Sequence, residues 1–456
     1  MGHYMRNRHY IVAFLLFLST ALLAQNNAVP FLNQPLNPIA AAPGGPGFTL
    51  TVSGTGFGSG AVLNWNGSPR ATTVTSGSKV QAMINMGDIA QVGTAAITVS
   101  NPTPGGGPSN IVYFPVRNAE SAIRLSDLDD EIPEGAVAVG DFNGDGKLDV
   151  AVAQTANVQI YPGKGNGSFG SSIVSNTSVL GFELATADFN GDGNLDLAVS
   201  DNRGFHTEIL FNGGKGHFTQ RGLTIPGAVE GIADFNGDGK LDLIVSAAAP
   251  GSNIRTDAYL GNGDGTFTLS QTLVGGDNYS VVGYVAIGDF NGDGKLDIAF
   301  PGRVCLGNGD GTFQPAMFTN ITGHAIATAD VNGDGKLDLI TDNVSISLGN
   351  GDGTFTNAGG VNLNGHFSFY INLGDFNNDG VLDIALAPTN SHEENQSVMI
   401  LEGRGDGTFK VPTVYTSDPI SIIQGFVMGD FNGDGSLDFL LGSENIGQVY
   451  LQRHSE

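Results

Sequence analysis

The stretch DFNGDGKLDVAV, which begins at Asp141, returns with small changes six more times in the chain. The later copies begin at Asp188, Asp234, Asp289, Asp330, Asp375 and Asp430, between 41 and 55 residues apart. A repeat of this period indicates an architecture in which each unit is one small supersecondary element. The chain therefore has to fold into a structure that packs seven similar units against one another.

Each copy is an acidic loop that passes directly into an apolar run. In the first copy, oxygen donors stand at positions one, three, five, seven and nine, which are Asp141, Asn143, Asp145, Lys147 (through its backbone carbonyl) and Asp149. Gly146 at position six permits the sharp turn that directs these donors toward one point. Calcium accepts many oxygen ligands in tolerant geometry, whereas magnesium demands a stricter arrangement, so the spacing predicts calcium.

The other six copies keep the same donor positions. They are Asp188, Asn190, Asp192, Asn194 and Asp196; Asp234, Asn236, Asp238, Lys240 and Asp242; Asp289, Asn291, Asp293, Lys295 and Asp297; Asp330, Asn332, Asp334, Lys336 and Asp338; Asp375, Asn377, Asp379, Val381 and Asp383; and Asp430, Asn432, Asp434, Ser436 and Asp438. The sixth copy departs most, with Asn378 at position four instead of glycine. A strand pattern follows position nine, which excludes an EF-hand or a dockerin. An acidic turn without metal stays open as the alternative.

The charge of the chain supports a cation in these loops. The 456 residues include 45 Asp and Glu against 19 Lys and Arg, a formal charge of −26, and the loops hold 21 of the acidic groups. Carboxylates packed this closely repel one another unless a cation neutralises them. The sequence therefore predicts up to seven structural calcium ions, and the same charge argues against nucleic-acid binding.

A second repeated element, GNGDGTF or a close variant, follows the third apolar run of each unit except the last. It ends at Phe169, Phe218, Phe267, Phe313, Phe355 and Phe409, so six turns accompany seven loops. The last unit also lacks a fourth strand, while SAIRLSDL, which begins at Ser121, precedes the first loop without a unit of its own. If that segment completes the last unit, the repeats close into a ring with only short, protected edges.

The predicted fold is all-β, with a seven-bladed β-propeller over residues 118–456 closed by its N-terminal strand. In up-and-down blades the acidic loops and the Gly-rich turns lie on one face. Because the chain enters the ring as a fourth strand, the preceding domain is expected on that face and the opposite face is expected to be free.

Residues 29–117 lack the acidic loop. Alternating runs such as FTLTVSGTGF and TAAITVSNP, separated by turn residues, predict a small antiparallel β-sandwich in which Trp65 is a packed residue.

Both parts resemble known families. LTVSGTGFGSGAVLNWNG and AAITVSNPTPGGGPSN resemble the IPT/TIG family of immunoglobulin-like domains, which are usually spacers or binding modules of surface proteins. The seven loops and six turns resemble the FG-GAP/VCBS repeats, whose propeller is found in integrin α heads. The resemblances imply a propeller carried behind a spacer or binding module.

The N-terminus is typical of an export signal over residues 1–24. Arg6 and Arg8 precede an apolar run from Ile11 to Ala24, which is short for a membrane span and ends at a small residue suited to cleavage. An uncleaved signal anchor is the alternative. No later run is long and apolar enough to span a membrane. We expect a monomer that is secreted or displayed on the cell surface, with the periplasm as an alternative location.

Candidate ligand residues occur in two long loops on the predicted free face, in the second and third blades. These loops and the next connection contain Arg203, His206, Arg255, Asp257, Tyr279 and Tyr284. Loops on a rigid scaffold are common binding sites, although ordinary loop variation explains the same residues equally well. The RGD sequence at Arg404 aligns with NGD in the other Gly-rich turns, so we interpret it as a turn variant.

No catalytic constellation is evident in the sequence. We find no nucleophile elbow, phosphate loop or clear acid/base pair, and Cys305, the only cysteine, aligns with packed strand residues and excludes an internal disulfide. The chain is predicted to be a calcium-stabilised binding or adhesion protein for an extracellular protein or glycan. The alternatives are a polysaccharide-active lyase or hydrolase and a purely structural envelope component.

Overall fold

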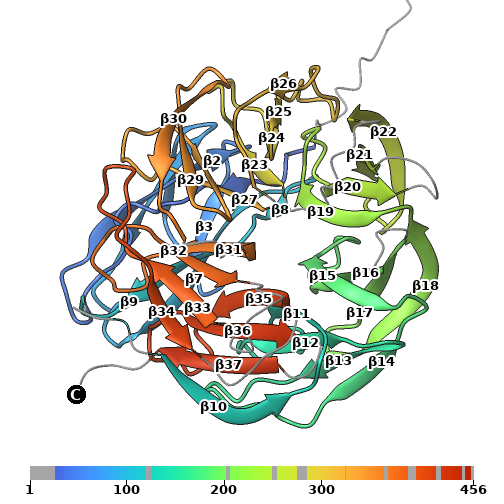
Figure 1. The fold of residues 1–456 in the computed structure, drawn as a ribbon, viewed down its shortest axis with the longest axis horizontal. Helices are drawn as coiled ribbons and strands as arrows, with labels where there is room; N and C mark the ends of the chain where they lie inside the picture. The colour runs from blue at the N-terminus through green and yellow to red at the C-terminus, as the bar shows by residue number, and fades with distance from the viewer. Residues whose placement is uncertain are drawn as a thin grey trace, which may run out of the picture.

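The computed structural model describes residues 26–119, 123, 125–201, 206–248, 254–274, 285–323, 325–363, 368–388, 397–416, 423–443 and 447–452 (Figure 1). Every regular element within these residues is a β-strand, which confirms the predicted all-β fold. The described part of the chain has no helix with the length and apolarity needed to cross a membrane.

Residues 26–116 form an N-terminal unit, here called the sandwich, which contains two sheets between Phe31 and Val116. One sheet has the order β1 (Phe31–Leu32), β2 (Phe48–Thr55), β6 (Lys79–Ile84) and β5 (Thr72–Ser76). The other has the order β4 (Ser68–Pro69), β3 (Val62–Trp65), β7 (Gly93–Asn101) and β8 (Gly107–Pro108), with β9 (Val112–Val116) also paired to β7. Alternation along β2 buries Leu50 and Val52, and both sheets contribute to one apolar core that contains Trp65.

The rest of the described chain forms seven four-stranded antiparallel sheets, which we number in chain order and together call the ring (Figure 1). Sheets one to three are β11 (Ala136–Gly140), β12 (Asp149–Ala153), β13 (Asn157–Tyr161), β14 (Ile173–Asn176); β15 (Gly181–Ala187), β16 (Asp196–Asp201), β17 (Thr207–Asn212), β18 (Phe218–Ile225); and β19 (Ala228–Ala233), β20 (Asp242–Ala248), β21 (Ile254–Gly261), β22 (Phe267–Val274). Sheets four to six are β23 (Ala286–Gly288), β24 (Asp297–Phe300), β25 (Arg303–Cys305), β26 (Met317–Phe318); β27 (Ile326–Ala329), β28 (Asp338–Thr341), β29 (Ser345–Gly349), β30 (Phe355–Gly360); and β31 (Ser368–Gly374), β32 (Asp383–Pro388), β33 (Ser397–Leu401), β34 (Thr413–Thr416). Second strands such as β12 are buried at every position because neighbouring sheets cover both of their faces.

The seventh sheet joins the two ends of the ring. Its order is β10 (Leu125–Ile132), β37 (Gly447–Gln452), β36 (Asp438–Ser443) and β35 (Ile423–Gly429). The segment before the first acidic loop therefore supplies the outer strand of the last sheet, with Leu125 opposite Gln452. This pairing agrees with the closure inferred from the missing turn.

Aromatic contacts link five of the seven neighbouring pairs of sheets in the described ring. The phenylalanine at position two of an acidic loop packs edge-to-face against the phenylalanine that ends the Gly-rich turn of the following sheet. The pairs are Phe142–Phe218, Phe189–Phe267, Phe235–Phe313 and Phe290–Phe355, with ring centroids 5.4 to 6.0 Å apart. Phe431 of the last loop makes the same contact with Phe169 of the first sheet at 6.0 Å, so the ring closes through its side chains as well as through its backbone.

The sandwich lies against the face of the ring that carries the acidic loops. The backbone N–H of Val29 donates to Oδ2 of Asp234 over 2.8 Å, and the N–H of Asp330 donates to the carbonyl of Gln34 over 3.2 Å. A Cβ added at Gly239 would lie 2.5 Å from the Cα of Gly105. These contacts agree with the expectation that the chain enters the ring on the acidic-loop face.

Candidate metal loops and the inter-unit cleft

Position one organises each acidic loop by accepting backbone hydrogen bonds. In loop one, Oδ1 of Asp141 accepts the N–H groups of Gly144 and Asp145 over 2.7 and 3.0 Å, and Oδ2 accepts the N–H of Gly146 over 2.8 Å. Gly144 and Gly146 have φ of 77° and 83°, a region that glycine adopts without a steric cost. The glycines at positions four and six therefore allow the backbone to wrap around one carboxylate.

Positions three, five and seven continue this wrapping. Oδ1 of Asn143 accepts the N–H of Asp145 over 2.8 Å, and Oδ1 of Asp145 accepts the N–H of Lys147 over 3.0 Å. The Nζ of Lys147 lies 3.9 Å from Oδ2 of Asp145, and its side chain runs beneath Gly165 of the Gly-rich turn in the same sheet. The loop and the turn therefore share one face of the ring.

Position nine connects the loop to the sheet. Oδ2 of Asp149 accepts the N–H of Phe142 over 3.0 Å, while Oδ1 accepts the N–H of Gly163 at the end of the third strand over 2.8 Å. The equivalent carboxylates Asp196, Asp242, Asp297, Asp338, Asp383 and Asp438 make the same pair of hydrogen bonds and are equally buried.

Burial and neighbouring charges raise the pKa of these position-nine carboxyls. The pKa is raised to about 7 for Asp242 and to about 8 for Asp383, first by removal from water and then by the carboxylates at positions one and five, against the opposing effect of the backbone hydrogen bonds. The pKa of Asp375 at position one is also raised, to about 6, for the same main reason. Each loop thus concentrates negative charge that its own hydrogen bonds do not fully offset.

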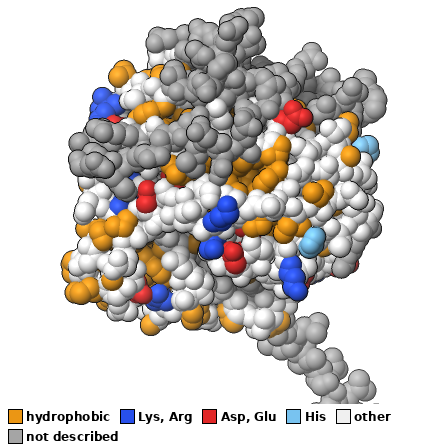
Figure 2. Space-filling model, turned by 90° about the horizontal axis from the view of Figure 1, so that it is seen from below, with side chains coloured by type: hydrophobic (Ala, Val, Ile, Leu, Met, Phe, Trp, Pro, Cys, Tyr) orange, Lys and Arg blue, Asp and Glu red, His pale blue; other side chains and the backbone are white. Residues whose placement is uncertain are grey.

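The loops suit a hard divalent cation by their chemistry. Every donor is an oxygen, and a cation would relieve the repulsion that raises the carboxyl pKa values. Within the described residues, no three carboxylate, imidazole or thiol groups lie close enough together to form a metal site. The oxygens of Asp141, for example, accept hydrogen bonds from backbone N–H groups of their own loop. On the side of the molecule in Figure 2, the acidic side chains of the described residues are few and separate from one another.

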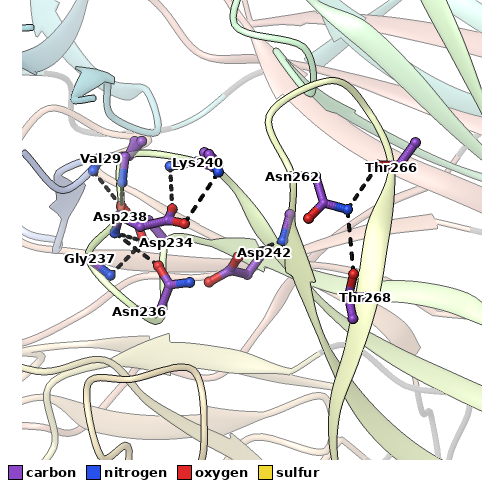
Figure 3. A network of polar contacts seen from close by, with 12 residues as sticks. Val29, Asp234, Asn236, Gly237, Asp238, Lys240, Asp242, Asn262, Thr266 and Thr268 are labelled. Atoms are coloured by element: carbon purple, nitrogen blue, oxygen red, sulfur yellow. Dashed lines mark hydrogen bonds and ion pairs between the residues drawn. The ribbon is translucent and has the colours of Figure 1, made fainter. Parts of the chain in front are cut away.

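Loop three is held between the ring and the sandwich (Figure 3). Asp234 accepts Gly239 N–H at Oδ2 over 2.8 Å in addition to the bond from Val29, and it is 6% exposed. Nearby, Oδ1 of Asp242 accepts the N–H of Gly261 over 2.8 Å, which ties the loop to the third strand. The sandwich therefore contributes directly to the hydrogen bonding of an acidic loop.

Loops six and seven are also covered, whereas loop one is open. Asp375 and Asn377 of loop six are 5% and 3% exposed, and Ser436 of loop seven is fully buried. In contrast, positions four to seven of loop one, residues 144–147, are exposed. The seven loops are alike in sequence but unlike in their access to solvent.

A cleft of about 1140 Å³ lies between the sandwich and the ring. One wall is the segment 33–42 with Lys79, and the other consists of loops four, five and six, with Lys336 among their residues. The linker residues 117–119 form part of the lining. Sequence reasoning missed this cleft, because only the packing of the sandwich on the ring creates it.

The predicted free-face ligand residues are only partly brought together. Nε of Arg255 donates to Oδ2 of Asp257 over 2.7 Å, and the fully buried Asp257 also accepts the hydroxyl of Thr272 over 2.7 Å. His206 lies apart from this pair in its contacts, with Nδ1 3.7 Å from Oδ2 of Asp201. Arg203, Tyr279 and Tyr284 lie outside the described residues.

The RGD sequence has the geometry of an ordinary Gly-rich turn. Oδ1 of Asp406 accepts the N–H and the hydroxyl of Thr408 over 3.0 and 2.6 Å, as Asp264 does with Thr266 in sheet three. NH1 of Arg404 donates to the carbonyl of Phe409 over 2.8 Å. The interpretation as a turn variant is confirmed. Cys305 is likewise a fully buried strand residue.

An acidic pair on the first strands of sheets two and three was also missed. Glu230 on β19 is 7% exposed, and neither carboxylate oxygen has a hydrogen-bond partner among the described residues. Burial and then the charge of Glu183 on β15 raise its pKa well above the ordinary value, and nearby Ser246 offsets only part of this. A register shift leaves Glu230 out of the strand pairing, and a second shift lies just before Glu183, which itself pairs with Ser200. The only sequence signal is a glutamate within an otherwise apolar first strand.

The comparison with protein families matches the repeats. The description FG-GAP-like repeat applies to residues 141–199, 234–300 and 375–441, and each match begins at position one of an acidic loop and spans two loops. Three segments of the chain therefore contain FG-GAP-like repeats, and together with the four-stranded sheets they support a β-propeller-like repeat protein. In this chain the FG-GAP-like repeats supply the position-two phenylalanines that contact the next sheet and the position-nine carboxylates that tie each loop to its own sheet.

Similar solved structures are distant. They include a lectin of Agrocybe aegerita described as recognising non-reducing terminal N-acetylglucosamine, with 18% identity and a TM-score of 0.44 over 78% of this chain and 96% of the lectin. Auxiliary nutrient binding proteins of Bacteroides ovatus and Bacteroides thetaiotaomicron have 8% and 11% identity and TM-scores of 0.38 and 0.36, over 93% of this chain and 98% of each. No curated protein matches. At these scores the likenesses transfer no ligand or activity to this chain.

Proposed function

We propose that this chain is a secreted or surface-displayed, calcium-stabilised protein that binds an extracellular protein or glycan. In this proposal a seven-bladed propeller of the integrin-α type follows an immunoglobulin-like spacer, and the signal is removed after Ala24. The observation that carries a binding role is the cleft of about 1140 Å³ between the two units, which is large enough for a small-molecule or oligosaccharide ligand.

Two surfaces compete as the ligand site, and one experiment separates them. A glycan array and an extracellular-protein pull-down with the full chain would first identify a ligand. Lys79 and Lys336 of the cleft would then be changed to Ala together, and Arg203 and Tyr279 of the free-face loops would be changed together in a second variant. Loss of affinity in the first variant at an unchanged melting temperature supports the cleft, and loss in the second supports the free face. A chain that binds nothing on either screen contradicts the binding role.

Calcium is proposed to stabilise the ring. Support comes from the three aspartates in each loop and from the raised pKa values of buried carboxyls such as Asp242, which a bound cation would lower again. Isothermal titration of the chelated chain should show calcium binding with a stoichiometry well above one ion per chain. Absence of calcium binding at millimolar concentration would contradict this part of the proposal.

A polysaccharide-active enzyme is the second candidate, and Glu230 is the observation that favours it. Burial and then the charge of Glu183 raise the pKa of Glu230, which is the direction that a general acid requires, and Glu183 provides a neighbouring carboxylate. A lyase and hydrolase screen tests the idea. Turnover that Glu230→Gln abolishes without a change in melting temperature supports the enzyme, whereas turnover that survives this change removes Glu230 from the mechanism.

A further inference from the structure

Loop six departs from the repeat at the point where the linker passes. Position four is glycine in the other six loops, with φ between 71° and 77°, but it is Asn378 with φ of 57° in loop six. Asparagine tolerates this left-handed region better than other non-glycine residues, yet it gives up the freedom of glycine. Something other than the turn itself therefore favours asparagine at this position.

The side chain of Asn378 contacts the linker. Its Nδ2 donates to the backbone carbonyl of Arg117, which follows the last strand of the sandwich directly. Asn378 is 6% exposed, so this hydrogen bond is shielded from water. The left-handed asparagine thus places a donor that glycine could not supply.

Loop seven contacts the side chain of Arg117, whose backbone carbonyl is bound by loop six. NH1 of Arg117 donates to Oγ of Ser436 at position seven, and both side chains are buried, at 3% and 0% exposure. Position seven is lysine in loops one, three, four and five, where the lysine runs beneath the Gly-rich turn of its own sheet. Sheet seven has no such turn, and a lysine there would bring a second positive charge against the guanidinium of Arg117.

We propose that Asn378, Ser436 and Arg117 form a joint that fixes the sandwich in one orientation on the ring. Arg117 and Asn378 also line the cleft, so the joint sets the separation of its two walls. The three are positioning residues. The joint uses the side chains at positions four and seven, whereas the proposed calcium donors are the loop side chains at positions one, three, five and nine and the backbone carbonyl at position seven.

The first test compares Asn378→Gly with Gly144→Asn in the full chain. Asn378→Gly removes the bond to Arg117 but relaxes the left-handed backbone, so the melting temperature should change little while trypsin cleaves after Arg117 roughly tenfold faster, equivalent to about 1.4 kcal/mol. X-ray scattering should show a broader distribution of shapes. Gly144→Asn is the matched control. It places asparagine at position four of loop one, where a Cβ has no close neighbour and where the linker does not pass. It should lower the melting temperature slightly and leave cleavage unchanged.

A second pair tests the charge argument. Ser436→Lys restores the lysine common at position seven and should detach the sandwich, with faster cleavage after Arg117, whereas Lys147→Ser in loop one should leave cleavage at the wild-type rate. If Ser436→Lys does not fold, the comparison of Asn378→Gly with Gly144→Asn still tests the joint. Wild-type cleavage and scattering in Asn378→Gly would overturn the joint, as would equal acceleration of cleavage in Gly144→Asn.

Discussion

The sandwich and the ring are both antiparallel β-structures, but they are stabilised differently. The sandwich has one continuous apolar core, with Leu50, Trp65 and Phe114 packed between its two sheets. The apolar residues of the ring fall into separate clusters, such as one that joins Phe142 to Phe218 across sheets one and two. Each sheet of the ring also carries a polar loop with a buried aspartate.

The difference lies in where charge is buried. In the sandwich, Asp88 pairs with Arg70 over 2.8 Å; burial raises the pKa of Asp88, but the N–H of Asn85 and then the guanidinium outweigh it, so the pKa is lowered. In the ring, burial and then the like charges at positions one and five raise the pKa values of the position-nine aspartates. The ring should therefore respond strongly to cations and pH, and the sandwich should not.

The largest expected effect is that of calcium removal. Chelation should lower the melting temperature of the ring and leave that of the sandwich unchanged, because a bound ligand stabilises only the state that binds it, by about 2.7 kcal/mol per site at one hundred times Kd. Differential scanning calorimetry with and without EDTA measures this, with magnesium as the control ion. Equal shifts in the melting temperatures of the ring and the sandwich would contradict the proposed difference in their dependence on cations.

The next effect comes from the closure of the ring. Phe431→Ala removes the edge-to-face contact between the last loop and Phe169 of the first sheet, and should cost about 3–5 kcal/mol in the ring transition. Trp65→Ala is the matched change in the sandwich, where it should lower the other transition by a similar amount. Urea unfolding followed by limited proteolysis can assign each transition. A ring transition unaffected by Phe431→Ala would show that its ends are not held together here.

A smaller effect is expected from pH in the chelated chain. The pKa is raised to about 7 for Asp297 and to about 8 for Asp383, so the folded ring keeps protons that the unfolded chain releases near pH 4. Stability of the ring should therefore fall as pH rises from about 4 to about 8. Asp88 has a lowered pKa, so its contribution to the sandwich is lost only as the pH falls below about 4.

Melting curves recorded with EDTA at intervals across this pH range test whether the stability of the ring falls as the pH rises. A chelated ring that gains stability as the pH rises would contradict the raised pKa values. Asp383→Asn should flatten the pH dependence, because it removes the group with the highest of these pKa values.

The smallest effect should come from the ion pairs within the loops. Nζ of Lys295 lies 3.6 Å from Oδ2 of Asp293, and both side chains are partly exposed. Such pairs contribute about 0.2–1 kcal/mol, so Lys295→Ala should shift the ring transition by little. A large destabilisation would mean that the lysine supports the loop through its packing beneath Gly309 rather than through its charge.

Much of the ring could be predicted because its repeats carry local information. Glycines at positions four and six require a turn, and the apolar runs on either side require strands, so seven similar units follow from the sequence. The missing turn of the last unit pointed to closure by the segment before Asp141, and Leu125 now lies opposite Gln452. Asn378 was visible as a departure, but its partner was not, because Arg117 is far away in the chain.

The candidate site shows the limit of this reasoning. Arg255 and Asp257 were predicted as ligand residues from loop length alone, and the structure pairs them with each other. The only sequence signal of Glu230 was its place in an otherwise apolar strand, and its burial could not be predicted because burial depends on the neighbouring sheet.

The sequence by itself determined the all-β class, the repeated acidic loops and the face they share, because these depend on local backbone preference and on strand alternation. Only the tertiary structure decided which loops are covered, where the cleft lies and what Asn378 and Ser436 contact. Those features arise where two separately folded units meet, and such contacts depend on shape and burial across long sequence separations rather than on any local pattern.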